Sequence, residues 1–227
     1  LDIGGESTRP GAEPVPAAEE LRRVLPVLES LAPRVSIPLS IDTYKPEVAR
    51  AALAAGASII NDVTGFRDPG MLSVAAASTA ACVCMHMLGT PQTMASLASY
   101  DDPVADLAAY FRGRMEALIA AGVDQSRIVL DPGIGFAKKT AHNLAILRNL
   151  HSFHSFGRPL LLGASRKRIL GDLTGRGEAG RLPGSIATAL AARLQGVHIV
   201  RVHDVAAIRD ALAVFDAVVP GASPAAG

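Results

Sequence analysis

At residues 158–171 the chain reads Arg-Pro-Leu-Leu-Leu-Gly-Ala-Ser-Arg-Lys-Arg-Ile-Leu-Gly. The apolar run 159–162 has the length of one buried strand, and it breaks at Gly163. Ser165, Arg166 and Lys167 then follow together. A strand that ends in a hydroxyl and several cations predicts a group at its C-terminal tip that binds an anion.

The same design recurs along the chain. Six other short apolar runs end in polar residues, and helical patterns with glycine or proline boundaries separate them. The runs lie at 1–4, 38–41, 58–60, 81–85, 127–130 and 198–201, and the helices are expected at 16–31, 46–55, 69–77, 103–121, 140–150, 185–194 and 206–219. We expect a Gly- and Arg-rich loop at 174–184. Short strands that are apolar on both faces are typical of parallel sheets.

Alternating strands and helices predict either a doubly wound sheet or a (β/α)₈ barrel. The barrel is favoured, because no strand leads directly into a Gly-x-Gly-x-x-Gly turn and polar residues follow nearly every strand. The chain opens within a strand and without Met, so we expect that a first strand–helix unit precedes it and that seven units are present. We expect one barrel domain at 1–219 and a flexible tail at 220–227.

Composition narrows the classes of partner. The 227 residues are 49% hydrophobic, and Lys and Arg number 22 against 21 Asp and Glu, giving a net charge of +1. This balance provides no global field for nucleic acid or membrane, and 4% aromatics without Trp argue against a surface that stacks single-stranded bases. Cys82 and Cys84 alternate on one strand and are expected to be buried thiols, which indicates a cytoplasmic protein.

Asp42, Asn61 and Asp131 follow three of the predicted strands. In a barrel such positions converge on one mouth, where His86 and the cations described next would also lie. Buried carboxylates require donors, and a flat heterocycle with amino and ring N–H groups would supply them. Each of Asp42 and Asn61 could instead cap the helix that follows it.

A second group of polar residues would surround the same mouth as an oxyanion clamp. It comprises the cations Arg9, Lys167, Arg201 and His203 with the hydroxyls of Ser7, Thr8 and Ser165. The alternative for each cation is an ordinary surface charge, and Arg166 and Arg168 are assigned to that class. The loop with Gly133, Gly135 and Phe136 could lie against a ligand, although Phe136 could equally belong to the core.

Taken together, these residues resemble the pterin-binding (β/α)₈ family, and within it the dihydropteroate synthases. Seven stretches carry the resemblance in order along nearly the whole chain: Gly4-Gly5-Glu6-Ser7-Thr8-Arg9-Pro10-Gly11, Ser40-Ile41-Asp42-Thr43, Asn61-Asp62-Val63, Met85-His86-Met87, Asp131-Pro132-Gly133-Ile134-Gly135-Phe136, Gly163-Ala164-Ser165-Arg166-Lys167 and Arg201-Val202-His203-Asp204.

The resemblance implies a reaction. A dihydropterin that carries a CH₂-pyrophosphate loses pyrophosphate, and the amine of p-aminobenzoate attacks the methylene carbon to give 7,8-dihydropteroate. It implies catalytic roles for Asp42, Asp131, Lys167 and Arg201. The pterin site would be Asp42, Asn61, Met85, Asp131, Gly135 and Lys167, the pyrophosphate site Ser7, Thr8, Arg9, Ser165, Arg201 and His203, and the p-aminobenzoate site Thr8, Arg9, Pro10, Phe136 and Lys167.

The resemblance also implies Mg²⁺ on the pyrophosphate and a homodimer. The family's metal-binding Asn lies in an N-terminal loop that the 227 residues do not contain, so no metal ligand is expected in this chain. Two other readings are a pterin-dependent corrinoid methyltransferase, which has no need of a pyrophosphate clamp, and a pterin-binding paralogue without catalysis. Small-molecule substrates are the expected partners, with neither nucleic acid nor membrane.

Overall fold

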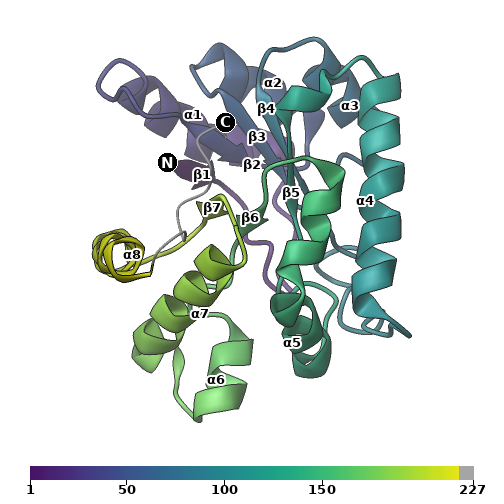
Figure 1. Ribbon diagram of the computed structural model, residues 1–227. Helices are drawn as coiled ribbons and strands as arrows, with labels where there is room; N and C mark the ends of the chain where they lie inside the picture. Colours follow the sequence, from purple (N-terminus) through teal and green to yellow (C-terminus); the bar gives the residue numbers. More distant parts are fainter. Residues whose placement is uncertain (220–227) are drawn as a thin grey trace.

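Seven parallel strands form a curved wall in the computed structural model, which describes residues 1–219 (Figure 1). They are β1 (Asp2–Gly4), β2 (Ser40–Asp42), β3 (Ile59–Asp62), β4 (Ala81–Met85), β5 (Ile128–Asp131), β6 (Leu161–Leu162) and β7 (Ile199–Val200). One ladder joins β1 to β5 in chain order, a second joins β6 to β7, and the bridge Leu130–Leu160 connects the two. The α/β barrel architecture is as predicted, and the expected tail at 220–227 lies outside the described residues.

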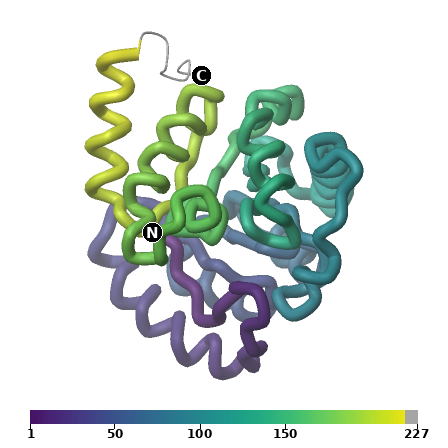
Figure 2. Tube along the Cα trace, turned by 90° about the horizontal axis from the view of Figure 1, so that it is seen from below, coloured from purple at the N-terminus to yellow at the C-terminus, as the bar shows by residue number. Residues whose placement is uncertain are grey.

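Helices surround this wall, as the view from below shows (Figure 2). They are α1 (Ala17–Leu31), α2 (Pro46–Ala54), α3 (Pro69–Ala76), α4 (Pro103–Ala120), α5 (Thr140–Arg148), α6 (Arg168–Thr174), α7 (Leu182–Leu194) and α8 (Val205–Val218), with 3₁₀ turns at η1 (Gln125–Arg127), η2 (Leu150–Phe156) and η3 (Glu178–Gly180). The sequence did not predict α6, because seven residues that include Gly171 give too short an apolar pattern.

The register of the strands decides which side chains face the inside of the wall. Asp42 pairs with Asn61, Asn61 pairs with Val83, and Met85 pairs with Asp131. Since residues two apart on a strand share a face, these positions all point inward. A small apolar cluster of Ile59, Val83, Val129 and Leu161 fills the interior one layer below them. Polar side chains therefore rest on an apolar floor at the C-terminal ends of the strands.

The outward faces of the strands pack against helices and form the main core. Ile60, Cys82, Cys84, Ile128 and Leu130 join helix side chains such as Leu107, Phe111 and Ile146 in one cluster. Both cysteines are free and buried, as predicted. Burial raises the pKa of the Cys82 thiol to about 11 and raises that of Cys84 still further, which makes both thiols unreactive at neutral pH.

The wall has a seam between β7 and β1. Within residues 1–219 no backbone ladder joins these two strands. The guanidinium of Arg201, just beyond β7, instead donates to the carboxylates of Asp2 and Asp42. Side chains therefore connect the two sides of the wall at this place.

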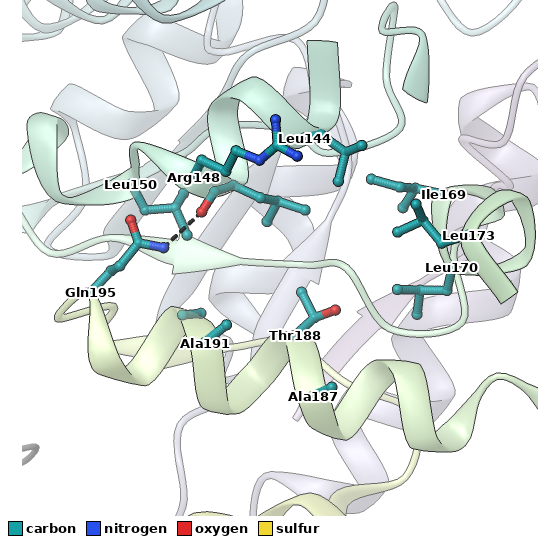
Figure 3. Close-up of a pocket in the computed structure, with 12 residues that line it drawn as sticks. Leu144, Arg148, Leu150, Ile169, Leu170, Leu173, Ala187, Thr188, Ala191 and Gln195 are labelled. Carbon is teal, nitrogen blue, oxygen red and sulfur yellow. Dashed lines mark hydrogen bonds between the residues drawn. The ribbon is translucent and has the colours of Figure 1, made fainter. Parts of the chain in front are cut away.

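The outer surface carries an apolar groove between α5, α6 and α7 (Figure 3). Leu144, Leu147, Ile169, Leu173 and Thr188 contribute to its lining, and none of the predicted site residues does. The groove is thus separate from the mouth of the strands. Among the described residues, none of the helices combines the length and the apolarity that crossing a membrane requires.

Candidate active site

Two buried polar side chains anchor the mouth at the strand ends. Asn61 and Asp131 are each 6% exposed. The Oδ1 atom of Asp42 is buried and receives no hydrogen bond from any residue within 1–219, while its Oδ2 accepts from Nη2 of Arg201 at 3.2 Å. Asp42 therefore offers an unused acceptor to a ligand that carries N–H groups.

The capping alternative for these residues is excluded. The helix α2 begins after Lys45, and α3 begins after Asp68, whose side chain accepts from the backbone N–H of Gly70. Neither Asp42 nor Asn61 occupies an N-cap position. Their polar groups face the interior of the wall because of strand alternation.

Burial shifts the charge states of both carboxylates. It raises the pKa of Asp42 to about 7, and the nearby Asp2 carboxylate adds to the shift while Arg201 opposes it. Burial likewise raises the pKa of Asp131, against the opposing charge of Lys167. These acids therefore titrate closer to neutrality than exposed carboxylates do.

Asp2 belongs to this site, although the sequence argument missed it. Its Oδ2 accepts from Nε of Arg201 at 2.6 Å and from Nδ2 of Asn61 at 3.2 Å. One oxygen thus links a predicted pyrophosphate residue to a predicted pterin residue. The available signal was strand alternation, because Asp2 is two residues before Gly4 and Gly4 pairs with Asp42.

Lys167 contacts the loop that follows β5. Its Nζ donates to the carbonyl of Ile134 and lies 4.6 Å from the centroid of the Phe136 ring. Gly135 has a φ of +84°, and a Cβ at that position would lie 3.3 Å from Cδ of Lys167. Burial lowers the pKa of Lys167 to about 8, with Asp131 opposing the shift. Phe136 therefore contacts Lys167 on one side and packs against an apolar cluster on the other.

A second buried lysine holds the same loop, and the sequence argument missed it as well. Nζ of Lys138 lies 2.8 Å from Nδ1 of His86 and donates to the carbonyls of Gly133 and Phe136, both at 3.0 Å. His86 is 1% exposed and packs against the ring of Tyr110, so it belongs to the core rather than the mouth. Burial, assisted by the charge of Lys138, lowers the pKa of His86 to about 2.

Ser165, His203 and Arg201 lie at the ends of the neighbouring strands β6 and β7. The hydroxyl of Ser165 accepts from the backbone N–H of His203 at 3.2 Å and lies 3.0 Å from Nδ1 of its ring. Burial opposes the charge of Arg201, but the carboxylates of Asp2 and Asp42 outweigh it and raise the pKa of its guanidinium. Ser165 and His203 are thus in contact, and Arg201 lies two residues before His203.

The loop with Ser7, Thr8, Arg9 and Pro10 makes its side-chain contacts with other residues than the rest of the predicted clamp. Nη2 of Arg9 pairs with the Glu178 carboxylate at 3.3 Å on an exposed surface, and the Ser7 hydroxyl accepts from the N–H of Arg9 at 3.4 Å. No hydrogen bond or ion pair described within residues 1–219 joins these residues to Ser165, Arg201 or His203. The structure therefore shows no direct link between the two halves of the predicted clamp. The loop itself lies against the loop that follows β4, where the N–H of Gly11 donates to the carbonyl of Pro91 at 2.9 Å.

Glu6 anchors that loop from its inner side. Its carboxylate accepts from the hydroxyl of Tyr44 at 2.8 Å and from the backbone N–H of Val15 at 3.2 Å, and it pairs with Lys45. Lys45 also pairs with Glu20, which is 1% exposed, at 2.5 Å. The loop is thus fixed to α1 and α2 at its base, whereas its tip carries the exposed Arg9.

Met85 is buried and lies on the inward face, as predicted for a residue that lines the pterin site. It packs with Val63, Met87 and Met94 in an apolar cluster to which Phe136 is adjacent. The described part of the chain contains no group of three or more His, Cys, Asp or Glu side chains that could hold a metal ion.

Comparisons with known proteins identify the family of this chain. The model of the pterin binding enzyme family matches residues 1–203. The dihydropteroate synthase of Escherichia coli K12 is 47% identical over 218 residues, which cover 96% of this chain and 77% of the relative.

Solved structures show the same relationship. The Xanthomonas albilineans dihydropteroate synthase with 4-aminobenzoic acid has a TM-score of 0.92 at 49% identity, over 97% of this chain and 80% of that one. The same enzyme in complex with 7,8-dihydropteroate has a TM-score of 0.88 at 46% identity, over 97% and 79%. The chain therefore belongs to the pterin-binding enzyme family, among its dihydropteroate synthases.

Proposed function

We propose that this protein condenses a dihydropterin methyl pyrophosphate with p-aminobenzoate to give 7,8-dihydropteroate and pyrophosphate, and that the reaction takes place at the C-terminal ends of the strands. The unpartnered, buried Oδ1 of Asp42 beside the amide of Asn61 carries the proposal. Such a pair suits the amino and ring N–H groups of a pterin. The related Xanthomonas albilineans enzyme has been solved with 7,8-dihydropteroate, the product named here.

The pterin would lie against the inward-facing layer of the wall. Asp42 and Asp131 would accept its N–H groups, Asn61 would pair with its edge, and Met85 would contact its ring. Lys167 would donate to the ring system from the other side, above the close approach that Gly135 permits. The apolar floor beneath these residues excludes water, which strengthens each of these hydrogen bonds.

Charge separation in the reaction matches the charges of the site. Cleavage of the carbon–oxygen bond leaves positive charge on the methylene carbon and negative charge on pyrophosphate. The Asp42 and Asp131 carboxylates would stabilise the first, and Arg201, Ser165 and His203 would stabilise the second. Asp2 already orients Arg201 at 2.6 Å. Ser7, Thr8 and Arg9 would complete the clamp once Arg9 exchanges its pairing with Glu178 for the pyrophosphate.

The p-aminobenzoate would lie between Phe136 and Lys167, beneath the loop with Thr8, Arg9 and Pro10. The Lys167 ammonium already lies over the Phe136 ring. The aryl amine is itself a nucleophile, so no covalent intermediate with the protein is required. The pair Ser165–His203 accordingly binds an anion in this proposal and does not attack the substrate.

Mg²⁺ is proposed to enter with the pyrophosphate oxygens. Pyrophosphate oxygens would supply most of its ligands. The ion would neutralise part of the charge of the leaving group. Turnover measured with and without Mg²⁺ tests this point.

The decisive experiment measures dihydropteroate formed from pterin pyrophosphate and p-aminobenzoate by the full-length protein. We expect Lys167→Ala and Asp131→Asn to lower turnover at least about 100-fold, as losses of groups that stabilise a transition state do. The control Arg168→Ala removes an exposed cation and should retain turnover within about twofold. Turnover within a few-fold of wild type in either site variant would exclude these roles.

Three further proposals concern the whole protein. We propose that residues 1–219 form one domain, that it pairs with a second copy, and that it works in the cytoplasm, a location consistent with two free thiols. The dimer is supported by exposed apolar side chains on α7 and α8, namely Leu194, Val205, Val214 and Val218, which are each more than 60% exposed. Sedimentation that shows a monomer at micromolar concentration would contradict the dimer.

A further inference from the structure

Arg166 lies between two residues of the site and has a left-handed backbone, with a φ of 55°. Residues other than glycine rarely adopt this conformation and persist in it only where their surroundings hold them. The two neighbours of Arg166 diverge from it. Ser165 contacts His203, whereas Nζ of Lys167 reaches the carbonyl of Ile134. The backbone of Arg166 thus separates the pyrophosphate side of the site from the pterin side.

Three sets of contacts hold Arg166 in this conformation. Its backbone N–H donates to the Ser185 hydroxyl at 2.9 Å, and its carbonyl accepts from Nη1 of Arg181 at 2.9 Å. Its guanidinium donates twice to Asp204, from Nε at 2.9 Å and from Nη2 at 2.5 Å. Two parallel hydrogen bonds between a guanidinium and a carboxylate fix orientation as well as distance.

The side chain of Asp204 bonds to Arg166 and does not cap the helix that follows it. It precedes α8 at the N-cap position, for which Asp is a preferred residue, yet its side chain makes no capping hydrogen bond. The bond to Arg166 lowers the pKa of the Asp204 carboxyl. Because Asp204 directly follows His203, the pair ties the loop after β6 to the loop after β7. The ladder between these strands has only two residue pairs, Leu161–Ile199 and Leu162–Val200.

We propose that Arg166 is a positioning residue. Held by Asp204, it sets Ser165 and His203 at a fixed place relative to Lys167, and it does not itself contact the substrate. Its own positive charge is already paired, so it contributes orientation and not attraction for the anion. This inference rests on the proposed function, because it concerns how the residues that would bind pyrophosphate are held in place.

Two variants separate orientation from simple charge. Asp204→Asn removes a negative charge near the mouth, whereas Arg166→Gly removes a positive charge and keeps a residue suited to a φ of 55°. Charge alone predicts tighter pyrophosphate binding for Asp204→Asn and weaker binding for Arg166→Gly. Positioning predicts that both variants weaken it, by about tenfold. Calorimetric titration of the full-length protein with inorganic pyrophosphate measures this.

A double variant and kinetics complete the experiment. If Arg166 acts through Asp204, the double variant binds pyrophosphate no more than about twofold more weakly than either single variant. In turnover, Arg166→Gly should raise the KM for pterin pyrophosphate about tenfold and change the KM for p-aminobenzoate less than threefold. Arg168→Ala is the matched control, because that side chain is 91% exposed and two residues away.

Four results would overturn the inference: tighter binding by Asp204→Asn, wild-type binding by Arg166→Gly, additive losses in the double variant, or an equal loss in Arg168→Ala. Additive losses would instead indicate that Arg166 contacts the anion. Thermal unfolding of each variant shows whether the fold is intact. A wild-type protein that binds pyrophosphate with this pattern but forms no dihydropteroate contradicts the proposed reaction and leaves the positioning role standing.

Discussion

Asp42 and Lys167 have pKa values that burial moves toward neutrality from opposite directions, to about 7 and about 8. Below pH 7 Asp42 binds a proton and loses acceptor capacity, and above pH 8 Lys167 loses the proton that it donates. The charged forms of both residues therefore coexist only in a narrow range of pH. The same burial that excludes water from the mouth thus defines when the mouth can work.

We predict a bell-shaped pH dependence of kcat/KM with a maximum between about 7 and 8. The fall in kcat/KM on the acid side reflects protonation of Asp42. In Asp42→Asn this fall should disappear, and kcat/KM should be lower at every pH. The pyrophosphate of the substrate can itself titrate in this range. The control is therefore the pH dependence of binding of a hydroxymethylpterin, which carries no phosphate. A flat binding profile between pH 6 and 8 would contradict the role of Asp42.

Asp2, on the neighbouring strand β1, should influence the pKa of Asp42 on β2. Its carboxylate is the second cause of the raised pKa of Asp42, after burial. Asp2→Asn removes that negative charge, so the pKa of Asp42 should fall and the acid limb should move to lower pH. Titration of pterin binding against pH measures the midpoint. A midpoint that stays in place or rises would show that Asp2 only supports Arg201 mechanically.

The loop that follows β5 shows how one element positions several side chains. Asp131 ends the strand and accepts from the backbone N–H of Gly133 at 2.8 Å, and Lys138 donates to the carbonyls of Gly133 and Phe136. Gly133 has a φ of +62°, and a Cβ there would lie 2.1 Å from the carbonyl oxygen of His86. Only glycine therefore allows the loop to lie against β4.

We predict that Gly133→Ala lowers the free energy of unfolding by about 2 kcal/mol or more and abolishes pterin binding, because both the backbone angle and the space are unfavourable. Gly175→Ala is the matched control. Gly175 has a φ of +70°, but a Cβ there meets nothing within 4 Å, so only a backbone cost of about 1 kcal/mol is expected. Urea denaturation of both variants measures the difference. Equal losses would show that the approach to His86 is unimportant.

At the scale of the molecule, the wall consists of a five-stranded ladder and a two-stranded ladder. The strands β3, β4 and β5 are joined by four residue pairs at each step, whereas β6 and β7 share only two, and Ile199 of β7 is 41% exposed. Stability should therefore differ between the two parts. The anion residues Ser165, Arg201 and His203 all follow strands of the two-stranded ladder.

We predict that amide hydrogen exchange is slowest in β3 to β5 and faster in β6 and β7, because local opening costs less where few buried contacts are broken. Mass spectrometry of peptides after timed exchange measures this. Inorganic pyrophosphate should slow exchange in β6 and β7 more than in β3 to β5. Uniform protection across all seven strands would contradict the difference.

The sequence by itself determined the alternation of strands and helices, the barrel class and the residues at the strand ends, because apolar runs and their polar termini are local patterns. It missed α6, whose seven residues give too little periodicity. It placed His86 at the mouth, and it missed Asp2 and Lys138, whose partners lie 59 and 52 residues away along the chain.

Only the tertiary structure decided which of the candidate cations share a site. Ser165 and His203 meet because parallel register brings the ends of β6 and β7 together, whereas Arg201 pairs with Asp2 and Asp42 across the seam. Arg9, equally cationic in the sequence, instead pairs with Glu178 on the surface. Residue type fixes what a side chain can bind, but long-range strand pairing and burial fix which side chains meet and which charge they carry.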